Sequence, residues 1–275
     1  LFLLVLIGIT LFILLTSNRE LNFENIKKFI LGCNPWLIAV AFVCMLLFIG
    51  FEGMSLHLIS RRLGHKNKLY SSMVYSAADV YYSALTPSAS GGQPASAYFM
   101  CSDGIPTGVV TVSLMVNLVM YTISIVVIGL CSIIFNPGIF LKFDAFSQTL
   151  IVLGTLIQGL IVAALVLLLR HEKVLKKICN GVLSFLSKIK LLKNRKKYEE
   201  KLEKTIEDYK HCAEMIRGRK AMIVKCFIFN VLQRVSTILV PVFVFLAAGG
   251  ELAKARSVFA VQNLVVLGSN CIPLP

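Results

Sequence analysis

Residues Thr86–Pro94 read TPSASGGQP, and this stretch decides how the chain folds. It separates two segments that are more apolar than itself, residues 70–85 before it and 95–100 after it. Proline lacks a backbone hydrogen-bond donor and glycine adopts a wider range of backbone conformations, so a helix is not expected to continue through this stretch. Non-helical backbone at membrane depth is tolerated only where protein buries it or where it lines a wet cavity. We interpret the stretch as a break inside a membrane; the alternative is a surface turn between two interfacial helices.

The composition around this break predicts a membrane protein. Of the 275 residues, 57% are hydrophobic and 15% are charged, whereas soluble domains average about 45–50% and about 25%. The apolar residues form long blocks, which is typical of membrane-spanning helices. We predict spans at residues 1–15, 35–59, 105–135, 149–169, 221–248 and from 258 onward, with a short interfacial helix within 16–34.

The basic residues predict the topology. Sixteen Lys and Arg and seven Asp and Glu lie between Arg170 and Lys220, and four more basic residues lie in 61–68. Basic residues next to apolar helices orient them and contact anionic lipid, so both segments are predicted to be cytoplasmic in the cell (plasma) membrane. An even number of crossings must separate them, and 105–135 and 149–169 supply two. Residues 70–100 are therefore predicted to enter and return as a re-entrant hairpin.

A second break, Pro273-Leu274-Pro275, ends the last predicted span. Two proline-broken segments that enter from opposite faces suggest an inverted repeat with a site at the midplane. The chain begins without Met and stops in apolar sequence, so we expect it to be truncated at both ends. The predicted fold class is an all-α polytopic membrane helical bundle, with residues 1–275 as one domain and 170–220 as a basic helical segment within it.

Charged residues inside the predicted spans indicate a candidate binding site. A charge at the bilayer centre costs ~2.5–3.5 kcal/mol or more, so it usually faces protein, water or a partner. Arg234 lies mid-span and is interpreted either as a receptor for a phosphate or carboxylate, balanced by Glu52 or Asp79 when empty, or as half of a structural ion pair. Asn263 either lines the same cavity or joins helices. The candidate cavity residues are Thr86, Pro87, Ser88, Ser90, Gly91, Gly92, Gln93, Pro94, Arg234, Gln233, Glu52, Asp79, Asn263, Pro273 and Pro275.

No sequence pattern predicts catalysis or metal binding. The four histidines are scattered, and neither H-E-x-x-H nor a P-loop occurs. The eight cysteines form no C-x-x-C and are interpreted as small buried hydrophobic residues. We expect no enzyme activity, no metal and no cofactor. Nucleic acid is not an expected partner, because no recognition motif accompanies the net charge of +14.

Residues Leu85–Phe99, LTPSASGGQPASAYF, resemble the signature of the lysylphosphatidylglycerol synthase transmembrane (flippase-like) family. This family includes the membrane domain of the multiple peptide resistance factor and stand-alone proteins. Ile272–Pro275 looks like the start of the family motif P-L-P-G-G-x-G, and Gln233-Arg234 followed by Pro241 looks like its late helix. The resemblance implies a helical bundle with re-entrant segments that moves lipid between leaflets. The transferase domain of fused members is not visible here, so synthase activity is not carried over.

The resemblance leads to an expected function of lipid translocation. A headgroup, anionic or sugar-bearing, would enter a polar cavity at the break, with Arg234 as a headgroup contact and membrane lipids as partners. Two alternatives stay open: a scaffold that holds lipid for a partner lipid-modifying transferase without moving it, and a small-solute secondary transporter. A homo-oligomer also stays open.

Overall fold

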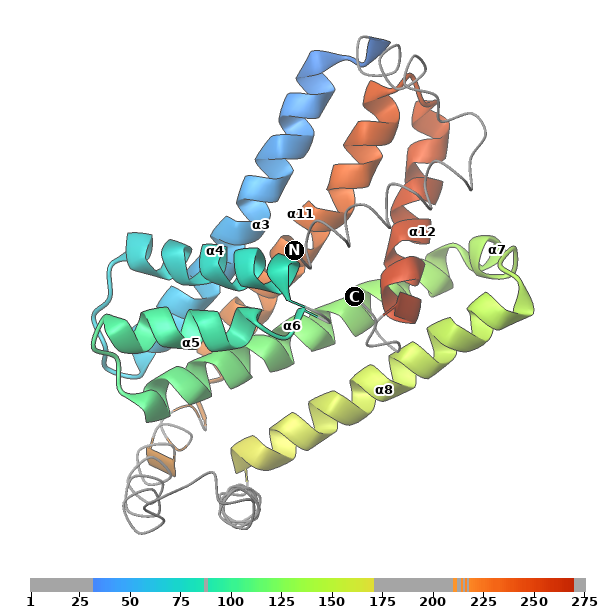
Figure 1. The fold of residues 1–275 in the computed structure, drawn as a ribbon. Coiled ribbons are helices and arrows are strands. Elements are labelled where there is room, and N and C mark those ends of the chain that lie inside the picture. The colour runs from blue at the N-terminus through green and yellow to red at the C-terminus, as the bar shows by residue number, and fades with distance from the viewer. Residues whose placement is uncertain are drawn as a thin grey trace.

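The computed structural model describes residues 32–86, 89–170, 210, 211, 214, 216 and 218–269, and every regular element within them is helical (Figure 1). The elements are α3 (Pro35–Arg62), α4 (Leu69–Leu85), α5 (Gly92–Ser102), α6 (Thr107–Phe135), α7 (Pro137–Phe140), α8 (Ala145–Arg170), α11 (Lys220–Ala247) and α12 (Leu252–Ser269). Four of them, α3, α6, α8 and α11, are long and apolar enough to cross a membrane. The predicted class, a polytopic helical membrane protein, is therefore confirmed.

The predicted spans at 35–59, 105–135, 149–169 and 221–248 correspond to these four helices. The span predicted from residue 258 is part of α12, which is not among the four; Lys254 and Arg256 lower the hydropathy of its first turns. The first predicted span, most of the interfacial helix and most of the basic segment 170–220 lie outside the described residues. The prediction of one domain stays a prediction.

α8 begins four residues earlier than the sequence predicted, and Asp144 explains why. Its carboxylate accepts hydrogen bonds from the Ser147 hydroxyl at 2.6 Å and from the Ser147 backbone N–H at 3.2 Å. These bonds satisfy a backbone donor that the first helical turn leaves free. The helix therefore extends back through a polar turn that hydropathy alone places outside it.

Two long helices, α3 and α11, pack antiparallel and form one side of the bundle (Figure 1). At one end the Asn34 backbone N–H donates to the Ala247 carbonyl at 2.9 Å. At the other end Arg219 Nη1 donates to the Arg62 carbonyl at 2.6 Å. Asn34 also caps α3 by accepting from the Trp36 backbone N–H at 3.0 Å. The two helices are thus aligned along their whole length.

A second group of helices packs beside this pair. α6 and α8 are joined through the short α7, and α12 contacts both of them and α11. A Cβ on Gly129 of α6 would lie 2.7 Å from Leu267 Cγ of α12, so glycine permits the close approach of these two helices. The outward faces remain apolar: Phe42 is 65% exposed and Leu160 is 71% exposed. Such faces suit lipid rather than water.

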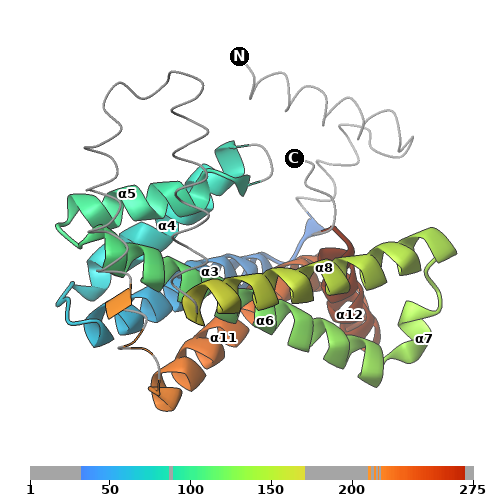
Figure 2. The same cartoon turned by 90° about the horizontal axis from the view of Figure 1, so that it is seen from below.

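α4 and α5 form a hairpin against this bundle, lying side by side in both views (Figures 1 and 2). With 17 and 11 residues, they rise about 26 Å and about 17 Å, less than the ~30 Å hydrocarbon core. The chain therefore doubles back at the break, as the re-entrant prediction requires. The break is shorter than predicted, because α5 begins at Gly92 and includes Pro94 in its first turn, where proline is tolerated.

Candidate functional site

The break itself is closed by Thr86. Its Oγ1 donates to the Tyr82 carbonyl at 2.7 Å and accepts from the Gly91 backbone N–H at 2.8 Å. A Cβ on Gly91 would lie 2.8 Å from that same Oγ1, so a side chain there would displace the bond. Ser90 and Pro94 are exposed at the tip, and Pro87 and Ser88 lie outside the described residues.

The first turn of α5 reaches the middle of α4 through Gln93. Its Nε2 donates to Asp79 Oδ2 at 2.6 Å, while the Ser83 hydroxyl donates to Asp79 Oδ1 at 3.2 Å. Gly92 makes this approach possible, because a Cβ there would lie 2.7 Å from the Asp79 carbonyl oxygen. Three predicted site residues, Asp79, Gly92 and Gln93, therefore meet at one point of the hairpin.

Asp79 in turn lies close to Glu52 of α3. Glu52 Oε2 also accepts from the Ser76 hydroxyl at 2.9 Å and from Gln233 Nε2 at 3.3 Å. Both carboxyl groups are buried, with Glu52 5% exposed and Asp79 8% exposed. The structure thus connects the break on the hairpin to α3 and α11 through a continuous set of polar side chains.

Arg234 of α11 follows Gln233 and is only 6% exposed. Its Nη1 donates to the Tyr121 hydroxyl of α6 at 3.4 Å. Its Nε and Nη2 are buried and have no hydrogen-bond partner among the described residues. Within the same part of the chain, Arg234 forms no salt bridge with Glu52 or Asp79. A buried guanidinium with unpaired donors is costly unless something accepts those bonds.

A second polar cluster, which the sequence analysis missed, lies between α3, α6 and α11. The Ser55 hydroxyl donates to Asn117 Oδ1 at 2.6 Å, and Asn230 Nδ2 lies 3.2 Å from each of them. The spacing held a signal: Ser55 lies one turn after Glu52, and Asn230 lies one turn before Arg234. Residues three or four apart share a helix face, so these polar positions extend the faces that carry the charges.

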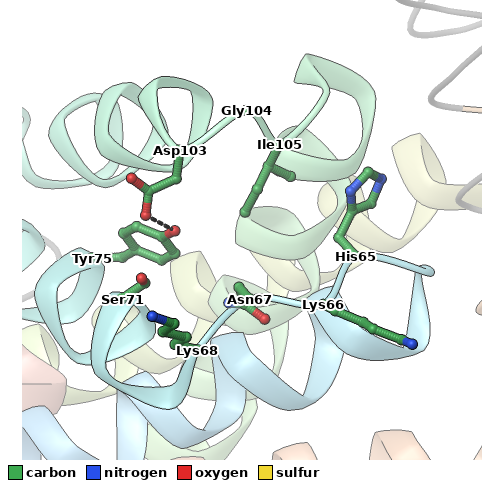
Figure 3. A pocket seen from close by; sticks show the side chains of 9 residues that line it. All are labelled: His65, Lys66, Asn67, Lys68, Ser71, Tyr75, Asp103, Gly104 and Ile105. Atoms are coloured by element: carbon green, nitrogen blue, oxygen red, sulfur yellow. Dashed lines mark hydrogen bonds between the residues drawn. The ribbon is translucent and has the colours of Figure 1, made fainter.

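The open end of the hairpin is joined by Tyr75, whose hydroxyl donates to Asp103 Oδ2 at 2.5 Å. Figure 3 shows this pair at one side of a pocket of about 330 Å³. The pocket lies between the connection from α3 to α4 and the connection from α5 to α6, with Lys66 and Lys68 on its rim. Its basic rim lies at the same end of α3 as Arg61.

Some predicted site residues do not join the cluster. Asn263 Nδ2 donates to the Phe259 carbonyl of its own helix at 3.1 Å, so the recorded bond neither joins helices nor reaches Arg234. Pro273 and Pro275, and with them the second break of the suggested inverted repeat, lie outside the described residues. In the described residues, no group of three or more His, Cys, Asp or Glu is placed to hold a metal ion.

The fold and this cluster define a class: a polytopic helical membrane protein with a broken hairpin set against buried charge. The comparisons name the family. The sequence model of the family described as the lysylphosphatidylglycerol synthase TM region matches residues 2–275, so the chain belongs to that family. A UPF0104 membrane protein of Archaeoglobus fulgidus is 28% identical over 105 residues, which is 38% of this chain and 31% of the relative. The alignment thus covers less than a third of that relative. No solved structure matches the chain.

Proposed function

We propose that this chain is a flippase-like unit that moves the headgroup of an anionic or sugar-bearing lipid between leaflets. The observation that carries the proposal is Arg234, which is buried, has two nitrogens without a partner among the described residues, and follows Gln233, whose amide bonds Glu52. A phosphate or carboxylate oxygen is the acceptor that a guanidinium binds best. The family name supports lipid as the source of that group, since it refers to the membrane region of a lipid synthase.

The polar side chains between Arg234 and the break supply a path for a headgroup. Gln233 contacts Glu52, Glu52 lies close to Asp79, and Asp79 contacts Gln93 at the start of α5. Hydrogen-bonding groups at this depth replace the water that a headgroup loses on leaving the interface. Acyl chains would stay in the bilayer, along the exposed apolar faces of the spans. The hairpin is the element that would shift to admit or release the headgroup.

The remaining expectations are part of the same proposal. The protein would lie in the plasma membrane, with residues 61–68 and the segment 170–220 in the cytoplasm, where their positive charge gathers anionic lipid. Its partners would be membrane lipids, and a lipid-modifying transferase would supply or consume the lipid. The chain itself would move lipid without catalysing a covalent reaction.

Transport in vesicles tests the proposal. The protein is reconstituted with tail-labelled fluorescent phosphatidylglycerol. The fraction of labelled lipid in the outer leaflet is followed with an impermeant reductant that bleaches the fluorophore, or by extraction. Wild type should exchange the lipid faster than empty vesicles, and Arg234→Gln should slow exchange by about ten- to hundredfold, as expected for losing a charge-assisted contact of about 1.5–3 kcal/mol. Lys225→Gln is the matched control, because Lys225 is exposed on the same helix.

The outcomes separate the alternatives. Retention of a defined lipid by native mass spectrometry, with no exchange in vesicles, would favour a lipid-holding scaffold. Equal exchange by wild type and Arg234→Gln would remove Arg234 from the headgroup path. Exchange that is absent while a small solute moves with an ion gradient would favour a secondary transporter.

A further inference from the structure

A separate cavity of about 610 Å³ lies between the last turns of α3, the start of α4 and α11. Its apolar lining consists of Met54, Leu58, Leu69 and Phe229. Its polar lining consists of His57, Arg61 and Arg62. None of these residues belongs to the cluster around Arg234, so the cavity is a second candidate site. Its volume is in the range of sites that hold a small molecule or part of a lipid.

One face of α3 supplies both apolar and basic residues to the cavity. Met54, His57, Leu58 and Arg61 follow one another at spacings of three, one and three, which places them on one side of a helix. Arg61 and Arg62 are exposed and end a span that is apolar enough to cross a membrane. The cavity is therefore apolar toward the membrane interior and cationic where the span ends. No acidic residue is among its lining residues in the described part of the chain.

His57 adds a polar group inside the cavity. Its side chain lines the cavity and also interacts with the side chain of Asn67. His57 lies one turn deeper than Arg61, so a polar group of a ligand beside the imidazole would lie just below the arginines. The glycerol ester and phosphate of a phospholipid have this order of polar groups above an acyl chain.

We propose that this cavity binds one anionic diacyl phospholipid from the leaflet on the Arg61 side. The phosphate lies at Arg61 and Arg62, and one acyl chain lies against Met54, Leu58 and Phe229. Basic cavities at the ends of membrane helices bind anionic headgroups by this combination of charge and apolar contact. A soluble anion would leave the apolar lining of the cavity exposed to water. A zwitterionic lipid would gain less binding free energy from two arginines than an anionic lipid. The inference concerns binding alone and does not require that the protein translocate lipid.

The single tryptophan of the chain makes a direct test possible. Trp36 lies at the opposite end of α3 from Arg61 and is 80% exposed. The double variant Trp36→Phe/Phe229→Trp moves the reporter into the cavity, with Trp36→Phe/Leu58→Trp as a second reporter. Each full-length protein is reconstituted in vesicles that mix unbrominated phosphatidylcholine with either brominated phosphatidylglycerol or brominated phosphatidylcholine. Bromine quenches tryptophan only at contact, so the quenching curve measures occupancy of the cavity.

The cavity reporter should be quenched at a lower fraction of brominated phosphatidylglycerol than of brominated phosphatidylcholine, by about fivefold for each arginine in contact with the phosphate. The wild-type reporter, Trp36, should show little preference. Adding Arg61→Gln and Arg62→Gln should remove the preference and leave quenching by phosphatidylcholine unchanged, which shows that the cavity still forms. The control pair Lys66→Gln and Lys68→Gln removes the same charge from the pocket beside Tyr75 and Asp103, and it should keep the preference for phosphatidylglycerol. Equal quenching by both lipids, or equal loss in both pairs of variants, overturns the proposal.

Discussion

The side-chain amide of Gln93 donates a 2.6 Å hydrogen bond to the carboxyl group of Asp79, fourteen residues earlier on the other arm of the hairpin. This bond fastens the first turn of α5 to the middle of α4. It also links the break to the buried Glu52–Asp79 pair, since Asp79 lies close to Glu52. The broken segment and the buried charges are therefore parts of one site rather than two separate features.

The first prediction concerns this bond. Gln93→Leu should leave Asp79 with one hydroxyl partner, Ser83, and should destabilise the hairpin by about 1–3 kcal/mol, the cost of leaving a buried polar group unsatisfied. Hydrogen exchange of the amides in residues 79–93 should speed up while exchange in α6 does not. Ser102→Ala is the control, because the Ser102 hydroxyl donates to the Tyr98 carbonyl of its own helix. Equal effects of the two variants would mean that the Gln93–Asp79 bond does not hold the hairpin.

A second prediction contrasts two glycines. Gly92→Ala should destabilise the protein by about 1–3 kcal/mol, since the added methyl would lie 2.7 Å from the Asp79 carbonyl oxygen and must push the hairpin arms apart. Gly50→Ala should be neutral or stabilising by about 0.5–1 kcal/mol, because Gly50 lies within α3 with open space around its Cβ position. Thermal denaturation in detergent measures both. Destabilisation by Gly50→Ala as large as that by Gly92→Ala would contradict the close contact as the cause.

The spans and the hairpin could be predicted from sequence because apolar runs and clusters of basic residues are strong signals. Long apolar runs with few charges predict membrane helices, and the hairpin at residues 70–100 was expected on the premise that the basic segments 61–68 and 170–220 lie on one side of the membrane. The start of α8 was missed because a cap, not hydropathy, sets it: Asp144 extends the helix to Ala145. The predicted start of α12 at residue 258 is too late for a related reason. Hydropathy does not detect the first helical turns from Leu252, because they contain the polar residues Lys254 and Arg256.

The candidate site was predictable only in part. Sequence identifies Glu52, Asp79 and Arg234 because charges inside apolar helices are rare. It does not determine which of them pair, because partners come from different helices at distances of tens to hundreds of residues along the chain. Gln233 meets Glu52 across 181 positions, for example. Tyr121 was missed because a tyrosine in a span is unremarkable until its hydroxyl is found beside Arg234.

A third prediction tests the open end of the hairpin. Tyr75→Phe removes the hydroxyl that donates to Asp103 and should destabilise the hairpin by about 0.5–1.5 kcal/mol, the net value of an ordinary hydrogen bond. The loss is modest because Asp103 is exposed and water can replace the donor. Tyr70→Phe is the matched control, since Tyr70 is 77% exposed on the same helix. Limited proteolysis near residues 103–105 should quicken in the first variant alone; faster cleavage in both would point to a general effect of losing a tyrosine hydroxyl.

A fourth prediction concerns the cluster between α3, α6 and α11. Asn230→Leu removes the amide that bonds Ser55, Asn117 and the Cys226 carbonyl. Hydrogen bonds between membrane helices average about 0.6 kcal/mol and reach about 1.7 kcal/mol, so we expect a loss of about 1–2 kcal/mol in detergent. Ser236→Ala, which removes a hydroxyl that bonds its own helix at the Leu232 carbonyl, should cost less. An equal cost for both would show that the cluster does not join the helices.

The last prediction is a pH dependence at the start of α8. The hydrogen bonds from the Ser147 hydroxyl and backbone hold the pKa of the Asp144 carboxyl below its usual range. A carboxyl whose pKa is lowered on folding stabilises the folded state above its unfolded pKa, near 4, and loses that contribution as pH falls through the lowered value. Amide exchange at residues 145–148 should therefore deviate upward from its intrinsic pH dependence only in acid. Asp144→Asn should remove that acid-induced step. Ser147→Ala should return the Asp144 pKa toward its usual range, and an unchanged pKa in that variant would show that Ser147 is not the cause.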